Sequence, residues 1–143
     1  MVSARCKDKL IKLSFTPNPV DATVTGNMYK FEEVLQNVIN NAIDALEEKR
    51  QKSKIDFSMK ISIKSFQENG FVVVTVDDNG IGISPENIEH VIHPFFTTKE
   101  MSKGTGLGLS ITSRIIKEMR GTLSVASTPV GGTCFTVRLP SKE

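Results

Sequence analysis

Two strand-like runs joined by a tight turn place the strongest constraint on how this chain folds. Residues 59–67 ("MKISIKSFQ") and 71–78 ("FVVVTVDD") contain the β-branched and aromatic residues that favour strands. Between them, "ENG" (68–70) contains the Asn–Gly pair that is typical of hairpin turns. A second hairpin is predicted near the end of the chain, where "TLSVAS" and "TCFTVRLP" flank "TPVGG". Two hairpins predict a mixed, mostly antiparallel sheet.

Further strands and several helices are predicted around these hairpins. The strands lie at 10–15, where apolar and polar residues alternate, and at 20–25. The predicted helices span residues 28–52, 84–92 and 107–119. Gly121 lies just beyond the last helix, where helices commonly stop, and residues 93–106 have no consistent period and are interpreted as a loop. A sheet with helices covering one face is an α+β fold, a two-layer α/β sandwich.

The size and charge of the chain limit the classes of protein to which it can belong. Its 143 residues suit one domain spanning 1–143. The net charge of +2 is too small for a nucleic-acid-binding surface, and no apolar run approaches the length of a membrane span. Cys6 and Cys134 follow no spacing pattern, which predicts free thiols in a reducing compartment. We therefore expect a cytoplasmic domain without membrane or nucleic-acid contacts, whether or not the parent protein is membrane-anchored.

The long predicted helix carries polar residues in its middle. At about 100° per residue its apolar positions share one arc: Phe31, Val34, Leu35, Val38, Ile39, Ala42 and Leu46. Asn37, Asn41 and Asp44 lie within about 60° of one another at one edge of this arc, whereas Asn40 lies off this line and is interpreted as solvated or locally bonded. Amide oxygens suit a Mg²⁺ ion that already carries phosphate and water. The alternative is a polar edge that faces solvent, and the helix alone favours neither interpretation.

A carboxylate and two glycines end the strand at 71–78. In "DDNGIG", Asp78, Gly80 and Gly82 are spaced two apart, and glycine lets the backbone turn sharply and approach a ligand. A carboxylate at a strand end can accept a hydrogen bond from an exocyclic amine such as that of adenine. The alternative is an ordinary strand-to-helix turn.

A second glycine-rich stretch, "KGTGLGLS" (103–110), opens the predicted helix at 107–119. N–H groups at a helix start form an anion site, although the stretch matches neither a Walker loop nor a dinucleotide-binding fingerprint. A flexible linker is the alternative. In the preceding "HPFFTTK", burial of Phe95 and Phe96 would anchor a lid, with Lys99 or Lys103 reaching phosphate. Alternatively, the phenylalanines fill the core and the lysines are solvated.

Together these stretches closely resemble the ATP-binding catalytic domain of sensor histidine kinases, within the GHKL (Bergerat-fold) ATPase superfamily. The resemblance runs from about residue 10 to 140 and includes four motifs in the family's order. "NVINNA" resembles the asparagine box, "DNGIG" the first glycine box, "PFFTTK" the phenylalanine box and "GTGLGLS" the second glycine box. The resemblance implies a Bergerat fold that uses ATP and Mg²⁺.

The resemblance also implies roles for individual residues. Asn41 would coordinate Mg²⁺, with Asn37 assisting, and Asp78 would accept a hydrogen bond from the adenine amine. Thr133 would support the Asp78 contact, and Ile83 would pack near the base. Gly80 and Gly82 would let the backbone approach the nucleotide. Further nucleotide-binding positions implied by the family are Asp44, Lys99, Gly104, Thr105, Gly106, Leu107 and Gly108. Asp44 matches a position that is acidic in some relatives and basic in others.

One departure from the wider superfamily indicates where the phosphoryl group goes. Hydrolytic relatives have a water-activating glutamate one turn before the metal asparagine, whereas this chain has Asn37, which cannot act as a general base. We therefore expect a histidine kinase domain that donates the γ-phosphoryl group to a histidine on a separate dimerisation domain. A response regulator would then receive that group.

The chain itself offers no clear acceptor. His90 and His93 flank the expected lid and lack a third partner for a metal site, so the dimerisation domain is expected to lie outside these residues. The alternative functions are a GHKL hydrolase fragment and a non-catalytic nucleotide-binding regulatory module.

Overall fold

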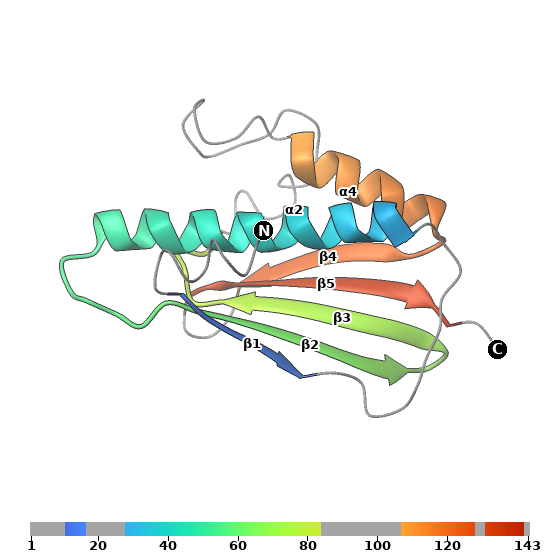
Figure 1. Ribbon diagram of the computed structural model, residues 1–143, viewed down its shortest axis with the longest axis horizontal. Coiled ribbons are helices and arrows are strands. Elements are labelled where there is room, and N and C mark those ends of the chain that lie inside the picture. Colours follow the sequence, from blue (N-terminus) through green and yellow to red (C-terminus); the bar gives the residue numbers. More distant parts are fainter. Residues whose placement is uncertain (1–10, 17–27, 84–106, 128–130, 142–143) are drawn as a thin grey trace.

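Five strands and two helices form two layers in the computed structural model, which describes residues 11–16, 28–83, 107–127 and 131–141 (Figure 1). The elements in chain order are β1 (Lys12–Thr16), α2 (Met28–Lys52), β2 (Lys60–Glu68), β3 (Phe71–Asp78), α4 (Leu107–Glu118), β4 (Thr122–Ser127) and β5 (Thr133–Pro140). The strands form one sheet in the order β1-β2-β3-β5-β4. Both described helices lie on the same side of the sheet, so the predicted two-layer α+β fold is confirmed.

The sheet is mixed, as the two hairpins predict. β1 pairs with β2 in parallel, whereas β2–β3, β3–β5 and β4–β5 are antiparallel. Asn69 and Gly70 connect β2 to β3, and both have positive φ angles, 51° and 80°. Two consecutive positive φ angles are the requirement of a type I′ turn, which Asn–Gly meets at low steric cost. The predicted hairpin is therefore confirmed together with its sequence cause.

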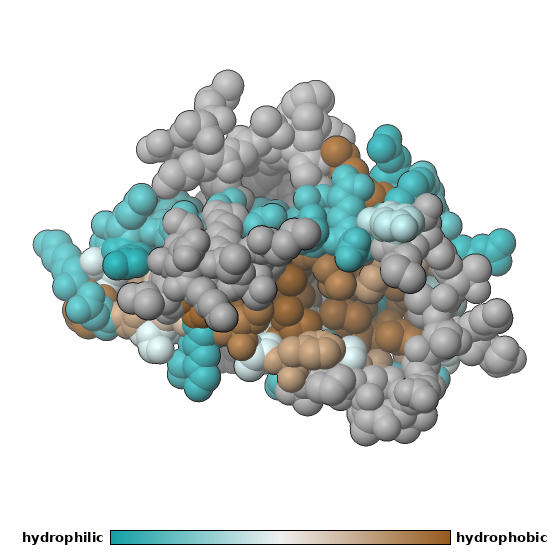
Figure 2. Space-filling view, in the orientation of Figure 1, coloured by the Kyte–Doolittle hydropathy of each residue, from teal (hydrophilic) through white to brown (hydrophobic). Residues whose placement is uncertain are grey.

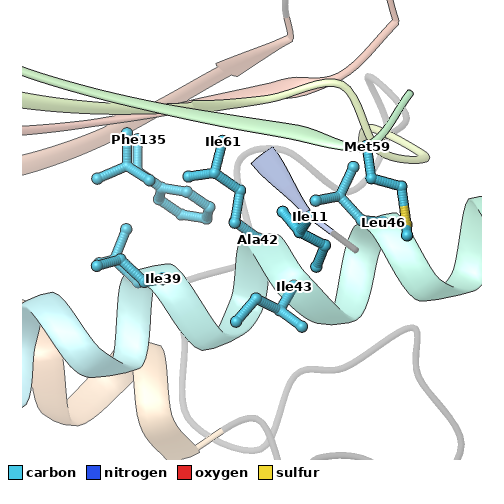
Figure 3. Close-up of a cluster of buried hydrophobic side chains, with 10 residues drawn as sticks. Ile11, Ile39, Ala42, Ile43, Leu46, Met59, Ile61 and Phe135 are labelled. Carbon is cyan, nitrogen blue, oxygen red and sulfur yellow. The ribbon is translucent and has the colours of Figure 1, made fainter. Parts of the chain in front are cut away.

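The core lies between α2 and the sheet. Figure 3 shows Ile39, Ala42 and Leu46 of α2 directed toward the strands that carry Ile61 and Phe135. A second cluster joins α2, α4 and the sheet; it contains Val34, Val74, Ile115, Ile116, Val137 and Leu139. In Figure 2 hydrophobic side chains form a band beneath α2, and hydrophilic ones gather over the helices.

The predicted apolar arc of α2 is confirmed, but the buried arc is wider. Five of its seven positions are buried: Val34, Val38, Ile39, Ala42 and Leu46. Phe31 and Leu35 are partly buried against the second cluster. Ile43 was not assigned to the arc, yet it is fully buried within the first cluster.

The end of α4 differs in detail from the sequence prediction. The N–H groups of Arg120 and Gly121 donate to the carbonyls of Lys117 and Ile116, both at 2.9 Å, which is the Schellman pattern. The left-handed residue is Arg120, with a φ of 63°, and not Gly121. Glycine is instead required at position 121 because a Cβ there would overlap the carbonyl oxygen of Arg138 on β5. The helix stops where predicted, for a partly different reason.

Three predicted segments lie outside the described residues: the strand at 20–25, the helix at 84–92 and the loop at 93–106. The predicted strand at 10–15 is β1, shifted by about one residue. No described helix combines the length and the apolar character needed to cross a bilayer.

Candidate functional site

Asp78 ends β3 with its carboxylate turned toward the helix side of the sheet. Its side chain shares that side with Val74 and Val76, because alternate residues of a strand face the same way. The residue is only 4% exposed. Oδ1 accepts a hydrogen bond from the Gly80 N–H at 2.8 Å, whereas Oδ2 is buried and has no hydrogen-bond partner among the residues that the structure describes. A buried carboxylate oxygen without a donor is costly, and a ligand N–H would relieve that cost.

The environment of Asp78 shifts the pH range in which its carboxyl group ionises. The pKa of Asp78 is raised from 3.8 to about 6, mainly by burial and to a smaller extent by the neighbouring Asp77 carboxylate. The backbone N–H groups of Gly80 and Thr133 and the charge of Lys49 lower this pKa. The group is therefore mainly ionised at neutral pH and can accept a hydrogen bond. Thr133 is buried and lies directly opposite Asp78 on β5, the residue whose contact it was predicted to support.

The glycine loop after Asp78 is packed against α2. A Cβ on Gly80 would lie 2.7 Å from the carbonyl carbon of Ala45, and the Ile81 N–H donates to the Ala45 carbonyl at 3.1 Å. The close neighbour of Gly80 in the structure is thus the helix backbone. Its predicted approach to a nucleotide stays a prediction.

The same loop also contacts the β4–β5 connection. Gly82 has a φ of 78°, and a Cβ there would overlap the carbonyl oxygen of Gly131. A Cβ on Gly132 would overlap the carbonyl oxygen of Asp78. Ile83 is held by its carbonyl, which accepts a hydrogen bond from the Ser127 hydroxyl at 3.0 Å. From the sequence, Gly132 was predicted only to belong to a turn. The contact with the Asp78 backbone was missed, because a pair of glycines does not indicate which strand they will approach.

Asn79 holds the loop to the start of β2. Its Oδ1 accepts from the Lys60 N–H at 2.8 Å, and its Nδ2 donates to the Ser58 carbonyl at 2.7 Å. Lys49 of α2 donates to the Asn79 carbonyl at 3.0 Å while its Nζ stands 4.6 Å from the centre of the Phe57 ring. Sequence reasoning missed both Asn79 and Lys49, since their partners are distant in the chain.

The asparagine stripe of α2 lies against α4. Asn37 Nδ2 donates to the hydroxyl of Thr112 at 3.2 Å, and Asn41 Nδ2 donates to the Asn37 backbone carbonyl at 2.8 Å. Asn37, Asn41 and Asp44 are half-buried, and so is Asn40. The stripe is therefore not the solvated helix edge that the alternative interpretation described. Thr112 was missed, although its place three and four residues before two buried isoleucines marks the core face of α4.

The two parts of the candidate site follow one another along α2. Ala45, which Gly80 touches, lies one helical turn beyond Asn41. The spacing of one turn, about 5–6 Å, brings the end of the stripe close to the loop that follows Asp78. The loop that follows Asp78 and the asparagine stripe are thus neighbours along α2.

Only two of the predicted lid positions lie within the described residues: Leu107 and Gly108, which begin α4. The remaining lid and histidine positions, with Cys6, lie outside the described residues: His90, His93, Phe95, Phe96, Lys99, Lys103, Gly104, Thr105 and Gly106. Within the described part of the chain, no three His, Cys, Asp or Glu side chains are grouped closely enough to hold a metal ion. The metal role of Asn41 stays a prediction. Cys134 is a free thiol, as predicted, and burial raises its pKa to about 11.

Comparison with known proteins places the chain. The family described as histidine kinase-, DNA gyrase B- and HSP90-like ATPases matches residues 26–143. Sensor kinase CckA of Brucella abortus is 35% identical over 98% of this chain and 15% of its own length. Sensor histidine kinase ZraS of Salmonella typhimurium is 35% identical over 98% of this chain and 28% of its own length. The chain thus spans less than a third of these relatives.

Solved structures show the same architecture. The catalytic domain of histidine kinase ThkA superposes with a TM-score of 0.79 at 29% identity, covering 99% of this chain and 87% of that one. The mycobacterial sensor histidine kinase MprB has the same fold, with a TM-score of 0.79 at 22% identity over 99% of this chain and 90% of that one. The predicted resemblance to the ATP-binding catalytic domain of sensor histidine kinases is confirmed by these comparisons.

Proposed function

Since the chain belongs to the family of histidine kinase-, DNA gyrase B- and HSP90-like ATPases, we propose that it binds Mg²⁺–ATP and donates the γ-phosphoryl group to a histidine. The acceptor histidine is carried on the dimerisation domain of a sensor kinase, and a response regulator receives the group afterwards. The observation that carries the proposal is the buried Oδ2 of Asp78, to which no group in the described part of the chain donates, in a domain of an ATP-binding family.

Adenine recognition follows from this oxygen. The exocyclic amine of adenine donates a hydrogen bond, and an ionised, desolvated carboxylate is a strong acceptor for it. Oδ1 is already bound to the Gly80 N–H, which fixes the carboxylate so that Oδ2 is presented to the base. Ile83, held by Ser127, packs near the base. The glycine contacts keep the loop that carries these groups in place.

The metal and the phosphates belong at the asparagine stripe. The donor set fits Mg²⁺, because amide oxygens are neutral hard ligands and the remaining positions would be filled by phosphate oxygens and water. Asn41 would hold the ion, with Asn37 and Asp44 beside it. Mg²⁺ would neutralise charge on the transferring phosphoryl group. The lid positions, Lys99, Gly104, Thr105, Gly106, Leu107 and Gly108, would close over the phosphates.

Transfer to a histidine is favoured over hydrolysis by Asn37, which stands where hydrolytic relatives have a water-activating glutamate. Asn37 has a carboxamide, which cannot take a proton from water at neutral pH, and its Nδ2 is already donating to Thr112. The chain thus supplies positioning and charge neutralisation, and the nucleophile arrives from another domain. Brisk phosphate release by the domain alone would favour the hydrolase alternative.

Calorimetric titration of ADP with Mg²⁺ tests the nucleotide site. Asp78→Asn is expected to weaken ADP binding by about 10- to 100-fold, because its amide presents a donor to the adenine amine. Asp77→Asn, on the opposite face of β3, is the matched control and is expected to bind within about twofold of wild type. Normal ADP binding by Asp78→Asn would remove the adenine assignment.

The metal and transfer steps need two further measurements. Asn41→Ala is expected to abolish the Mg²⁺ dependence of ADP binding, whereas Asn40→Ala, off the stripe, is expected to retain it. For transfer, the domain is mixed with a candidate dimerisation domain and labelled ATP. Label that appears as acid-labile phosphohistidine supports the proposed function, and label that appears only as free phosphate contradicts it.

A further inference from the structure

Thr112 places a hydroxyl in the core of the molecule. The residue is 0% exposed, and Ile115 and Ile116, one turn further along α4, are also buried. An apolar residue of similar size would suit this position, and burying a hydroxyl without a hydrogen-bond partner is unfavourable. The hydroxyl oxygen accepts the hydrogen bond from Asn37 Nδ2 at 3.2 Å, across 75 residues of chain.

In this bond the Nδ2 end of the Asn37 carboxamide faces α4. The Nδ2 end is directed at Thr112, so the carbonyl oxygen at the other end is directed away from it. One turn further on, Asn41 also uses its Nδ2 within the protein, by donating to the Asn37 backbone carbonyl at 2.8 Å. Both carboxamides thus commit a nitrogen to the protein. The carbonyl oxygen is the end of an amide that can contact a cation or a water bound to it.

We propose that Thr112 is a positioning residue that orients the Asn37 carboxamide toward Mg²⁺ and phosphate, by a hydrogen bond from α4 to the asparagine stripe. The proposal rests on the proposed function, because it needs the ion to lie at that stripe. Without the hydroxyl, Asn37 loses the acceptor that holds Nδ2 toward α4, and Nδ2 turned toward the ion would repel it. Thr112 itself touches neither the ion nor the nucleotide.

The test compares ADP binding with Mg²⁺ and with EDTA, by calorimetry, in matched variants. Thr112→Val keeps the side-chain shape and removes the hydroxyl. It is expected to bind ADP in EDTA within about twofold of wild type but to lose about five- to tenfold of the affinity gained from Mg²⁺. Thr112→Ser is expected to recover most of that gain. Ser113→Ala, which removes the neighbouring hydroxyl of α4, is the control and is expected to behave as wild type.

A double-mutant cycle gives a second readout. If Thr112 acts through Asn37, then Asn37→Ala with Thr112→Val is expected to lose no more of the Mg²⁺ gain than Asn37→Ala alone. Circular dichroism and thermal melts check each fold. Should Thr112→Val fail to fold, Thr112→Ser and Thr112→Ala give the same comparison, since both lack the methyl group and differ in the hydroxyl.

The possible failures are distinguishable. A Thr112→Val domain with the full Mg²⁺ gain overturns the positioning role and leaves the proposed function standing. Equal losses with Mg²⁺ and with EDTA also overturn it, since they indicate only a packing role. If the wild-type domain shows no binding of ADP at all, the proposed function fails first and the positioning role fails with it.

Discussion

Gly80 lies against the backbone of Ala45, so that a Cβ on Gly80 would be 2.7 Å from the Ala45 carbonyl carbon and 2.9 Å from its oxygen. The Ile81 N–H donates to that same oxygen at 3.1 Å. The loop that follows Asp78 is therefore positioned by direct backbone contact with α2. Because α2 also carries the asparagine stripe, this contact sets the distance between the carboxylate and the stripe.

Replacement of Gly80 by alanine is expected to damage both stability and binding. The added methyl group meets backbone atoms that cannot rotate away, so unfolding free energy should fall by about 2–3 kcal/mol in urea titrations. ADP binding should fall at least tenfold, because the loop and Asp78 must shift.

Gly70→Ala separates these two effects. Gly70 has a φ of 80° and open space around its Cβ position, far along β3 from Asp78. Its replacement should lower unfolding free energy by about 1 kcal/mol and leave ADP affinity unchanged. If Gly80→Ala binds ADP normally, the contact with Ala45 does not position the site.

The ionisation of Asp78 predicts a trade-off between stability and binding. The native pKa of about 6 lies above the unfolded value of 3.8, so between these pH values the native state binds more protons than the unfolded state. Stability from this group is therefore greatest at low pH and falls as the pH rises from about 4 to about 6. Well above pH 6, burial of the ionised carboxylate lowers the free energy of unfolding by about 3 kcal/mol relative to its value at low pH, where the group is protonated.

Asp78→Asn removes the cost of burying an ionised carboxylate. The buried amide of the new asparagine offsets part of the stability gained in this way. The variant is expected to be more stable than wild type by about 1–2 kcal/mol at pH 8 and to lose this advantage near pH 4. Urea titrations at several pH values measure the difference. Asp56→Asn, at an exposed carboxylate, should remain within about 0.5 kcal/mol of wild type at each pH. A pH-independent difference for Asp78→Asn would show that Asp78 does not titrate in this window.

The base specificity of the site follows from the same carboxylate. Inosine diphosphate has a carbonyl oxygen where ADP has its amine, so it would set an acceptor against the ionised Oδ2. We expect inosine diphosphate to bind at least tenfold more weakly than ADP. In Asp78→Asn the preference should shrink or reverse, because the carboxamide can donate to a carbonyl. Equal affinities of the wild-type domain for both nucleotides would contradict the assignment of Asp78.

The features that were predicted from the sequence are those with local causes. The Asn–Gly turn requires two positive φ angles, the period of α2 identifies its buried arc, and its predicted bounds match Met28–Lys52. The polar stripe was recognised, but its two interpretations could not be separated, because the partner of Asn37 is Thr112, 75 residues away.

The features that were missed depend on tertiary contact. Gly132 is small because of Asp78, and Asn79 bonds to the start of β2. No local pattern specifies which backbone a glycine or an amide will meet after the sheet has formed. Ile43 was omitted because the first core cluster covers more of α2 than a single apolar arc.

The end of α4 offers a stabilising substitution away from the candidate site. Arg120 adopts a φ of 63°, which costs a residue with a Cβ about 1 kcal/mol relative to glycine. Arg120→Gly is therefore expected to raise the unfolding free energy by about 0.5–1 kcal/mol and to leave ADP affinity unchanged. Arg114→Gly is the matched control: it removes the same exposed side chain from inside the helix and should lower the unfolding free energy by about 1 kcal/mol. Urea denaturation of both variants measures the two signs, and a loss of stability in Arg120→Gly would mean that the arginine side chain stabilises this helix end by more than its backbone strain.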